Sequence, residues 1–225
     1  MTQLKKKPSI RGKFITFEGI DGCGKSTQAR RLAQRLREKG YNVLETREPG
    51  GTEIGLQLRS VLLNPDNAAM GANCELLLYL ADRVQHLDTV IRPALQREET
   101  VICDRFHDAT VAYQQHGRGL DLASLSCFLE KEVLSTAPDT TCWLDLEVEL
   151  AQARIQKRNR SQGGNGPRES RLDDAGRDFH ERVRSGYAAI HAAEPGRMLR
   201  VPATGDEAEI DATIWNLLSE RYHVL

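Results

Sequence analysis

A glycine-rich segment constrains the fold of this chain more than any other feature of its sequence. Residues 19–27 read GIDGCGKST and satisfy the spacing G-x-x-x-x-G-K-[ST]. They follow a short β-branched and aromatic run at residues 13–18 and precede residues 25–39, where alanine and leucine recur at helical spacing. Between a strand and a helix, such glycines let successive backbone N–H groups converge on phosphate oxygens, with the helix dipole behind them. The segment therefore predicts a phosphate-binding loop.

The side chains of this loop suit nucleotide chemistry. Lys25 is placed to neutralise the β- and γ-phosphates, and the Ser26 hydroxyl to ligate Mg²⁺. Asp21 is unusual, because a carboxylate within an anion-binding loop repels phosphates. It either faces a sugar hydroxyl or a metal-bound water, or is a solvated residue that favours the turn. With ATP and Mg²⁺ as the expected ligands, the candidate nucleotide-binding residues are Gly19, Asp21, Gly22, Cys23, Gly24, Lys25, Ser26 and Thr27.

The rest of the chain alternates between expected strands and expected helices. Strands separated by helices predict an α/β fold, in which a parallel sheet is covered by helices on both faces. The 225 residues, of which 40% are hydrophobic, fit one domain with residues 1–12 as a loose tail. Further strands are expected at residues 42–46, 100–103, 141–145 and 198–201, and further helices at residues 54–63, 75–95, 122–134, 148–157, 178–193 and 210–218.

Two charged residues follow the expected strand at residues 100–103. Ligands of a parallel sheet bind beyond the carboxyl ends of its strands, so Asp104 and Arg105 are expected in the ligand crevice. Asp104 is suited to hold a Mg²⁺-bound water, and Arg105 to grip an acceptor phosphate in a bidentate fork. The alternative is an ion pair that only stabilises the strand end. We count both among the candidate catalytic residues, together with Lys25 and Asp21.

A polar segment near the end of the chain predicts a lid. Residues 158–171 read RNRSQGGNGPRESR, with three glycines, four arginines and no apolar residue, so a mobile lid loop is expected at residues 158–172. Residues 20–23 contain no arginine. A lid arginine is therefore expected to act on the transferring phosphoryl group, Arg168 first and Arg160 second. The alternative is a solvated loop or a nonspecific anion patch.

Composition limits the partners of the chain. Lys and Arg number 31 against 32 Asp and Glu, so no nucleic-acid partner is expected. Five scattered cysteines without a CxxC pair or zinc-ligand spacing indicate free thiols in a reducing cytoplasm. No apolar run approaches the ~20 residues that span a bilayer, so no membrane association is expected.

Five stretches together resemble the bacterial-type thymidylate kinases. They are FEGIDGCGKST, REPGGTEIG, LLLYLADRVQH, CDRFHDATVAYQQHGRG and RLDDAGRDFHERVRSGY, at residues 17–27, 47–55, 76–86, 103–119 and 171–187. The resemblance implies the three-layer P-loop nucleoside monophosphate kinase fold, with a five-stranded parallel sheet and a mobile lid. It implies ATP-dependent phosphorylation of thymidine monophosphate to the diphosphate, and a homodimer formed through helices such as residues 75–95.

The resemblance also implies roles for single residues. Arginines that match Arg83 and Arg105 grip the acceptor phosphate in the family, and an aromatic residue at the position of Tyr79 stacks on thymine. Tyr79 departs mildly from the phenylalanine of many relatives, and Ala109 stands where some relatives carry a hydroxyl. The full set of implied acceptor-binding residues is Glu48, Arg59, Tyr79, Arg83, Arg105, Thr110, Tyr113 and Gln114, of which the last three read the base and close over the sugar.

Two other functions stay open at this point. A kinase of the same class with a different acceptor would share the phosphate loop. A nucleotide-dependent switch would share it too, but the chain has no N-K-x-D motif for reading guanine, and candidate acceptor arginines are not expected in a switch.

Overall fold

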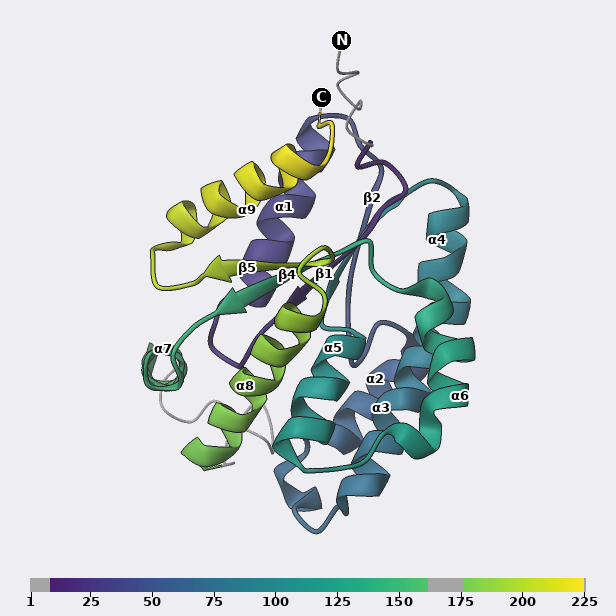
Figure 1. Cartoon of the computed structure of the whole chain (residues 1–225), viewed down its shortest axis with the longest axis vertical. Coiled ribbons are helices and arrows are strands. Elements are labelled where there is room, and N and C mark those ends of the chain that lie inside the picture. The colour runs from purple at the N-terminus through teal and green to yellow at the C-terminus, as the bar shows by residue number, and fades with distance from the viewer. Residues whose placement is uncertain (1–8, 162–175, 225) are drawn as a thin grey trace.

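The computed structural model describes residues 9–161 and 176–224. Their strands form a five-stranded parallel sheet in the order β2-β3-β1-β4-β5 (Figure 1). This architecture confirms the predicted α/β class and parallel sheet. The strands are β1 (Phe14–Glu18), β2 (Val43–Arg47), β3 (Thr100–Asp104), β4 (Thr140–Asp145) and β5 (Met198–Pro202).

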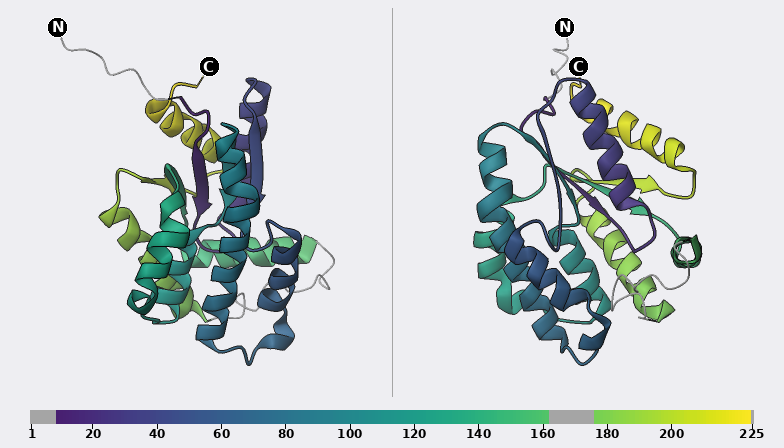
Figure 2. Two further views of the ribbon diagram at one scale, coloured as in Figure 1. Left: turned by 90° about the vertical axis from the view of Figure 1, so that its right-hand side faces the viewer. Right: turned by 180° about the vertical axis from the view of Figure 1, so that it is seen from behind.

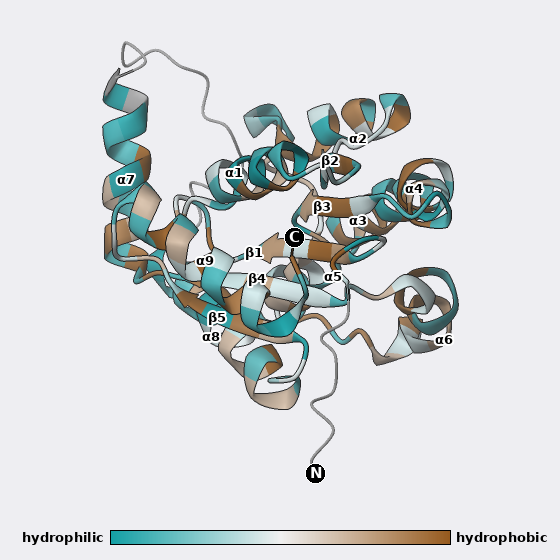
Figure 3. Cartoon of the chain, turned by 90° about the horizontal axis from the view of Figure 1, so that it is seen from above, coloured by the Kyte–Doolittle hydropathy of each residue, from teal (hydrophilic) through white to brown (hydrophobic). Residues whose placement is uncertain are grey.

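Helices cover both faces of the sheet. α1 and α9 lie side by side on one face, and α8 lies on the other (Figures 2 and 3). The described helices are α1 (Lys25–Glu38), α2 (Glu53–Leu63), α3 (Ala72–His86), α4 (Arg92–Gln96), α5 (His107–Thr110), α6 (Ser126–Phe128), α7 (Val148–Ser161), α8 (Arg177–Ala193) and α9 (Glu207–Arg221). Short helical segments join or extend them: η1 (Pro65–Asn67), η2 (Leu87–Ile91), η3 (Val111–Gly117), η4 (Ala123–Leu125), η5 (Leu129–Val133) and η6 (Leu134–Thr136).

The packing of the sheet explains where its charged residues gather. Every residue of β1 and β4 is buried, as expected for strands that helices cover on both faces. Because the strands are parallel, their carboxyl ends meet at one edge. β1, β2, β3 and β4 end there in the charged residues Glu18, Arg47, Asp104 and Asp145. The sheet thus brings charge to the edge at which parallel sheets bind ligands.

The N-terminal segment departs from the predicted loose tail. Ile10 is fully buried, and its carbonyl oxygen accepts a hydrogen bond from the Thr100 hydroxyl at 2.9 Å. Ser9 forms a parallel bridge with His223. The prediction of a loose tail is therefore wrong for residues 9–12, because Ile10 joins the hydrophobic core.

The start of the predicted lid also differs. α7 continues to Ser161, so residues 158–161 are helical rather than part of a loop. Arginine is a good helix former, and the first glycine of the segment is Gly163. Residues 162–172 of the predicted lid, with Arg168 and Arg171, lie outside the described residues. No helix of the described part of the chain combines the length and the apolar character that a bilayer span needs.

Candidate active site

The phosphate loop connects the end of β1 to the start of α1. Gly19 has a φ of 137° and Gly22 a φ of 83°, in the left-handed region that favours glycine. A Cβ atom at Gly19 would lie 2.6 Å from the carbonyl oxygen of Leu144, and one at Gly22 would lie 2.5 Å from that of Ala151. Only glycine fits at both positions, so the loop has the geometry that the sequence predicts.

Lys25 is held against the inner side of the loop. It is 6% exposed, and its Nζ donates to the Ile20 carbonyl oxygen at 2.9 Å and lies 3.8 Å from Asp21 Oδ1. Lys25 lines a polar cavity together with Gly24, Ser26 and Thr27. Of the predicted nucleotide-binding residues, Gly19 and Cys23 do not line this cavity, and the Cys23 thiol is buried in the core.

Ser26 and Asp104 meet where β3 ends beside the loop. The Ser26 hydroxyl donates to Asp104 Oδ2 in a short hydrogen bond. The other oxygen, Oδ1, is buried and has no hydrogen-bond partner among the described residues. A hydroxyl and a carboxylate oxygen are hard ligands of the kind that Mg²⁺ prefers. The predicted metal ligands therefore lie together and fit a magnesium ion.

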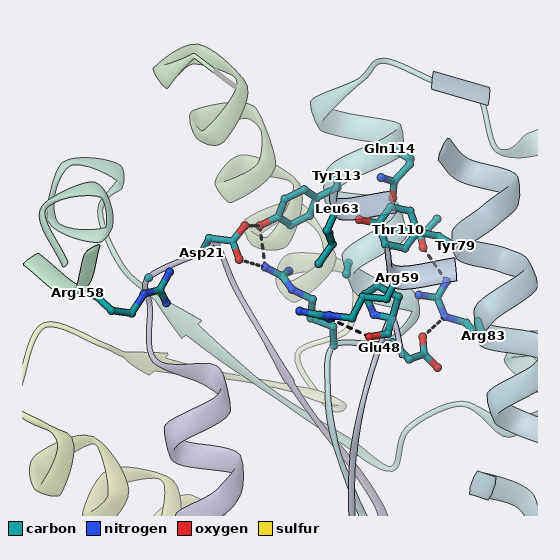
Figure 4. A pocket seen from close by; sticks show the side chains of 14 residues that line it. Asp21, Glu48, Arg59, Leu63, Tyr79, Arg83, Thr110, Tyr113, Gln114 and Arg158 are labelled. Atoms are coloured by element: carbon teal, nitrogen blue, oxygen red, sulfur yellow. Dashed lines mark hydrogen bonds and ion pairs between the residues drawn. The ribbon is translucent and has the colours of Figure 1, made fainter. Parts of the chain in front are cut away.

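A second cavity adjoins the phosphate loop, between α2, α3 and η3 (Figure 4). Its lining includes Pro49 and Leu63, and neither position was predicted. Apolar residues of a loop or helix give no sign of ligand binding in a single sequence. All eight predicted acceptor residues line it: Glu48, Arg59, Tyr79, Arg83, Arg105, Thr110, Tyr113 and Gln114. We call it the acceptor cavity, and the cavity around Lys25 the phosphate cavity.

Arg105 lies between the two cavities and lines both. Its Nη2 donates to Asp21 Oδ1 at 2.5 Å and to the Tyr113 hydroxyl at 3.0 Å, and its Nη1 donates to the Gly19 carbonyl oxygen at 3.2 Å. The Tyr113 hydroxyl in turn donates to Asp21 Oδ2 at 3.2 Å. Burial alone would raise the pKa of Asp21, but the charges of Arg105 and Lys25 outweigh burial and hold this pKa below its ordinary value. Asp21 is thus a paired carboxylate, not a solvated turn residue.

A buried acid holds the backbone directly after Arg105. Glu18 is fully buried; its Oε1 accepts from the Phe106 N–H at 2.6 Å and its Oε2 from the Tyr187 hydroxyl at 2.8 Å. Burial raises the pKa of Glu18 to about 8, although Arg105 opposes the shift. Arg105 itself adopts a left-handed φ of 72°. Sequence reasoning missed both Glu18 and Tyr187; an acid at the end of a buried strand was a usable signal for Glu18.

Arg83 lies at the end of the acceptor cavity away from the phosphate loop. It is 2% exposed and lines only the acceptor cavity, whereas Arg59 lines both cavities. Arg83 Nε donates to Glu48 Oε2 at 2.7 Å, Arg83 Nη1 to Thr110 Oγ1 at 2.7 Å and Arg83 Nη2 to a backbone carbonyl at 2.9 Å. Figure 4 shows Arg83, Tyr79 and Thr110 together at one end and Arg158 at the other. The position of Arg83 does not favour the phosphate contact that the resemblance implies, and Arg59 lies closer to the loop.

Several arginines line the phosphate cavity. Arg158, in the last turns of α7, lines both cavities, whereas Arg160 lines neither. Arg47 and Arg154 also line the phosphate cavity and were not predicted. Arg47 ends β2 at the ligand edge, so its position was a usable signal; Arg154 lies within an expected helix and gave none. The ranking of Arg168 over Arg160 stays a prediction, since Arg168 lies outside the described residues.

The site therefore has a phosphate loop, an adjoining pocket for a second substrate and an arginine that reaches from one to the other. On a parallel sheet of this order, that layout defines the class of P-loop nucleoside monophosphate kinases.

Comparisons with known proteins narrow the class to one family. The sequence profile described as thymidylate kinase matches residues 17–214. A thymidylate kinase of Trichlorobacter lovleyi is 46% identical over 211 residues, which cover 94% of this chain and 99% of that protein. One of Geotalea daltonii is 48% identical over 190 residues, 84% and 88% of the two chains. The crystal structure of thymidylate kinase from Ehrlichia chaffeensis superposes with a TM-score of 0.72 at 31% identity, covering 93% of this chain and 99% of that one. The chain belongs to the thymidylate kinase family.

Proposed function

We propose that this chain transfers the γ-phosphoryl group of ATP to thymidine monophosphate and so supplies thymidine diphosphate for dTTP synthesis. The observation that carries the proposal is the position of Arg105, which lines both cavities and is oriented by Asp21 of the phosphate loop. An acceptor phosphate bound there lies next to the phosphates of a nucleotide in the loop. The relatives named thymidylate kinase support thymidine monophosphate as the acceptor.

The donor half of the site suits the triphosphate of ATP. The backbone N–H groups of the loop and the Lys25 ammonium neutralise phosphate oxygens. Ser26 and Asp104 would hold Mg²⁺, which screens the phosphate charges when it is bound. Phosphoryl transfer needs little covalent chemistry from the protein, so positioning and fixed positive charge account for catalysis.

The acceptor half divides into a phosphate end and a base end. Arg59 and Arg105 bind the acceptor phosphate, because both line the two cavities. Arg83 keeps one N–H on each terminal nitrogen beyond its hydrogen bonds to Thr110 and a backbone carbonyl, and we assign these N–H groups to a carbonyl of the base. Tyr79 stacks on the base.

Residues between the phosphate end and the base end bind the sugar and the edge of the base. Tyr113 and Asp21 close over the deoxyribose, with Asp21 facing a sugar hydroxyl. Thr110 and Gln114 read the base, Thr110 through its contact with Arg83.

Arginines of α7 and the segment after it act on the transferring group. Arg158 is the described candidate, because it lines both cavities. Arg168 and Arg160 remain the candidates that the sequence suggests.

A steady-state assay tests this function. With ATP and Mg²⁺, thymidine monophosphate should give the highest kcat/KM among the nucleoside monophosphates, measured as ADP release with each acceptor in turn. A higher value for another monophosphate would overturn the acceptor assignment but leave the kinase class. ADP release with none of them would overturn both.

We also propose a cytoplasmic homodimer. Four large apolar side chains are exposed on α2 and α3, namely Ile54, Leu56, Val61 and Leu77, with Leu77 56% exposed. Burial of such a face in a second copy would remove it from water. Sedimentation should give twice the chain mass of 25.2 kDa, and Leu77→Asp should shift the equilibrium to monomer. All five cysteines are free thiols, which suits a reducing compartment.

A further inference from the structure

The side-chain amide of Gln114 is held from behind by a buried acid. Gln114 Nε2 donates to Glu75 Oε1 at 2.9 Å. Gln114, on η3, is 2% exposed and lines the acceptor cavity. Glu75, in the first turn of α3, is fully buried and is not part of the cavity wall. Glu75 therefore reaches the cavity through its hydrogen bond to Gln114.

An arginine holds both oxygens of the same acid. Arg118 Nη2 donates to Glu75 Oε2 at 3.0 Å, and Arg118 Nε donates to Glu75 Oε1 at 3.3 Å. A carboxylate paired with a guanidinium accepts hydrogen bonds and offers none. The amino group of Gln114, and not its carbonyl group, must therefore face Glu75.

This arrangement determines what Gln114 presents to a ligand. The two ends of a glutamine amide have nearly the same shape but opposite hydrogen-bonding character. With its amino group on Glu75, Gln114 keeps its carbonyl oxygen as an acceptor. No described residue donates a hydrogen bond to that oxygen.

We propose that Glu75, together with Arg118, is a positioning residue that makes the acceptor cavity select thymine over cytosine. The inference rests on the proposed function, since it concerns the base of the acceptor. N3 of thymine carries a hydrogen, which Gln114 Oε1 accepts. N3 of cytosine is itself an acceptor, so the same oxygen meets a lone pair, and a polar group left unpaired in a buried site discriminates strongly.

Three monophosphates test the proposal. Thymidine and deoxyuridine monophosphates share the same hydrogen-bonding edge of the base, whereas deoxycytidine monophosphate has the donor and acceptor reversed at N3 and at position 4. In Glu75→Gln, the shorter of the two Arg118 hydrogen bonds, from Nη2 at 3.0 Å, keeps the carbonyl oxygen of position 75 at the Oε2 place. The new amino group then faces Gln114 and turns its amide over. The ratio of kcat/KM for deoxycytidine monophosphate to that for thymidine monophosphate should rise about tenfold or more. The ratio of deoxyuridine to thymidine monophosphate should stay within about twofold of wild type.

The deoxyuridine ratio separates positioning from general damage, because a merely structural role for Glu75 would lower the rates with all three acceptors together. Glu53→Gln is the matched control: Glu53 is also a first-turn glutamate, on α2, but is exposed and lines neither cavity. It should change neither ratio.

The outcomes distinguish the inference from the function on which it rests. A folded Glu75→Gln enzyme with an unchanged cytosine ratio overturns the inference. A wild-type enzyme without preference for thymidine over deoxycytidine monophosphate overturns the proposed function instead. If Glu75→Gln melts below the assay temperature, Glu75→Met makes the same test, since it also removes the acceptor beside Gln114. There we expect a smaller rise in the cytosine ratio, because the amide samples both orientations, and an unchanged ratio again overturns the inference.

Discussion

The guanidinium of Arg105 and the carboxylate of Asp21 lie 2.5 Å apart, and this ion pair joins the acceptor cavity to the phosphate loop. Tyr113 bonds to both partners. An acceptor phosphate that reaches Arg105 therefore meets a cation whose orientation the phosphate loop already fixes. The pair therefore links the walls of the two cavities.

Removal of the loop cation should stop catalysis without unfolding the protein. We expect Lys25→Ala to lower kcat by about 100-fold or more, because the variant lacks the fixed charge beside the transferring phosphoryl group. Circular dichroism should be unchanged. Lys131→Ala serves as the control, since that side chain is 80% exposed, and it should keep full activity. Near-normal kcat in Lys25→Ala would refute the phosphate-loop mechanism.

Arg59 and Arg83 should differ in the part of the acceptor that they bind. Arg59→Ala should weaken the binding of thymidine monophosphate by about 10- to 100-fold, the effect of a lost charged hydrogen bond, and leave thymidine unaffected. Arg83→Lys should weaken both ligands to a similar degree, because Arg83 lies at the base end. Lysine is preferred to alanine at this position because Glu48 would otherwise be left buried without a partner charge. Inhibition constants for the two ligands provide the measurement. If Arg83→Lys weakens only the binding of thymidine monophosphate, Arg83 binds the acceptor phosphate and not the base.

Tyr113→Phe should relax the preference for deoxyribose. The hydroxyl of Tyr113 is held between Asp21 and Arg105, so its removal leaves room for one oxygen beside the sugar. We expect kcat/KM for ribothymidine monophosphate to rise relative to that for thymidine monophosphate. If the ratio of the two kcat/KM values does not move, sugar selection resides in another part of the cavity.

Glu18 should make the free energy of unfolding depend on pH. Its folded pKa of about 8 lies above the ordinary value of 4.5, so between these values the folded protein keeps a proton that the unfolded chain releases. Stability from this group is therefore greatest below about pH 4.5 and is lost as the pH rises towards 8, by at most about 1.4 kcal/mol per pH unit. Glu18→Gln still bonds Phe106 and Tyr187 but does not titrate. Urea unfolding at several pH values should show the variant gaining stability relative to wild type as the pH rises, and parallel pH profiles would contradict the assignment.

The arginines of the predicted lid should affect the chemical step more than binding. Arg158→Ala should lower kcat and change KM for both substrates little, because an exposed cation contributes weakly until the site closes around it. Arg168→Ala should do the same if the preference from the sequence holds, and Arg160→Ala and Arg171→Ala serve as comparisons. Single-turnover rates separate chemistry from product release. Wild-type rates in all four variants would refute a lid cation.

The sequence predicted those parts of the site that depend on local order. The phosphate loop and the charged residues after β3 follow from a few adjacent positions, so Lys25, Ser26, Asp104 and Arg105 could be named in advance. The acceptor residues followed from family resemblance, and all eight line one cavity. The partners of these residues could not be named, because tertiary packing creates them: Tyr187 meets Glu18 across 169 positions, and Glu75 meets Gln114 across 39. The end of α7 was predicted at residue 157 but lies at Ser161, because a polar run was taken for a loop although its arginines favour a helix.

The close approach of α7 to the phosphate loop determines which element can place a positive charge beside the bound phosphates. The Ala151 carbonyl oxygen occupies the space that a side chain at Gly22 would need. The loop thus has no room for a cation of its own at that position. The same helix, two turns further on, carries Arg158 to the rim of both cavities. α7 thereby excludes one possible source of positive charge and provides another, and both effects come from the same helix.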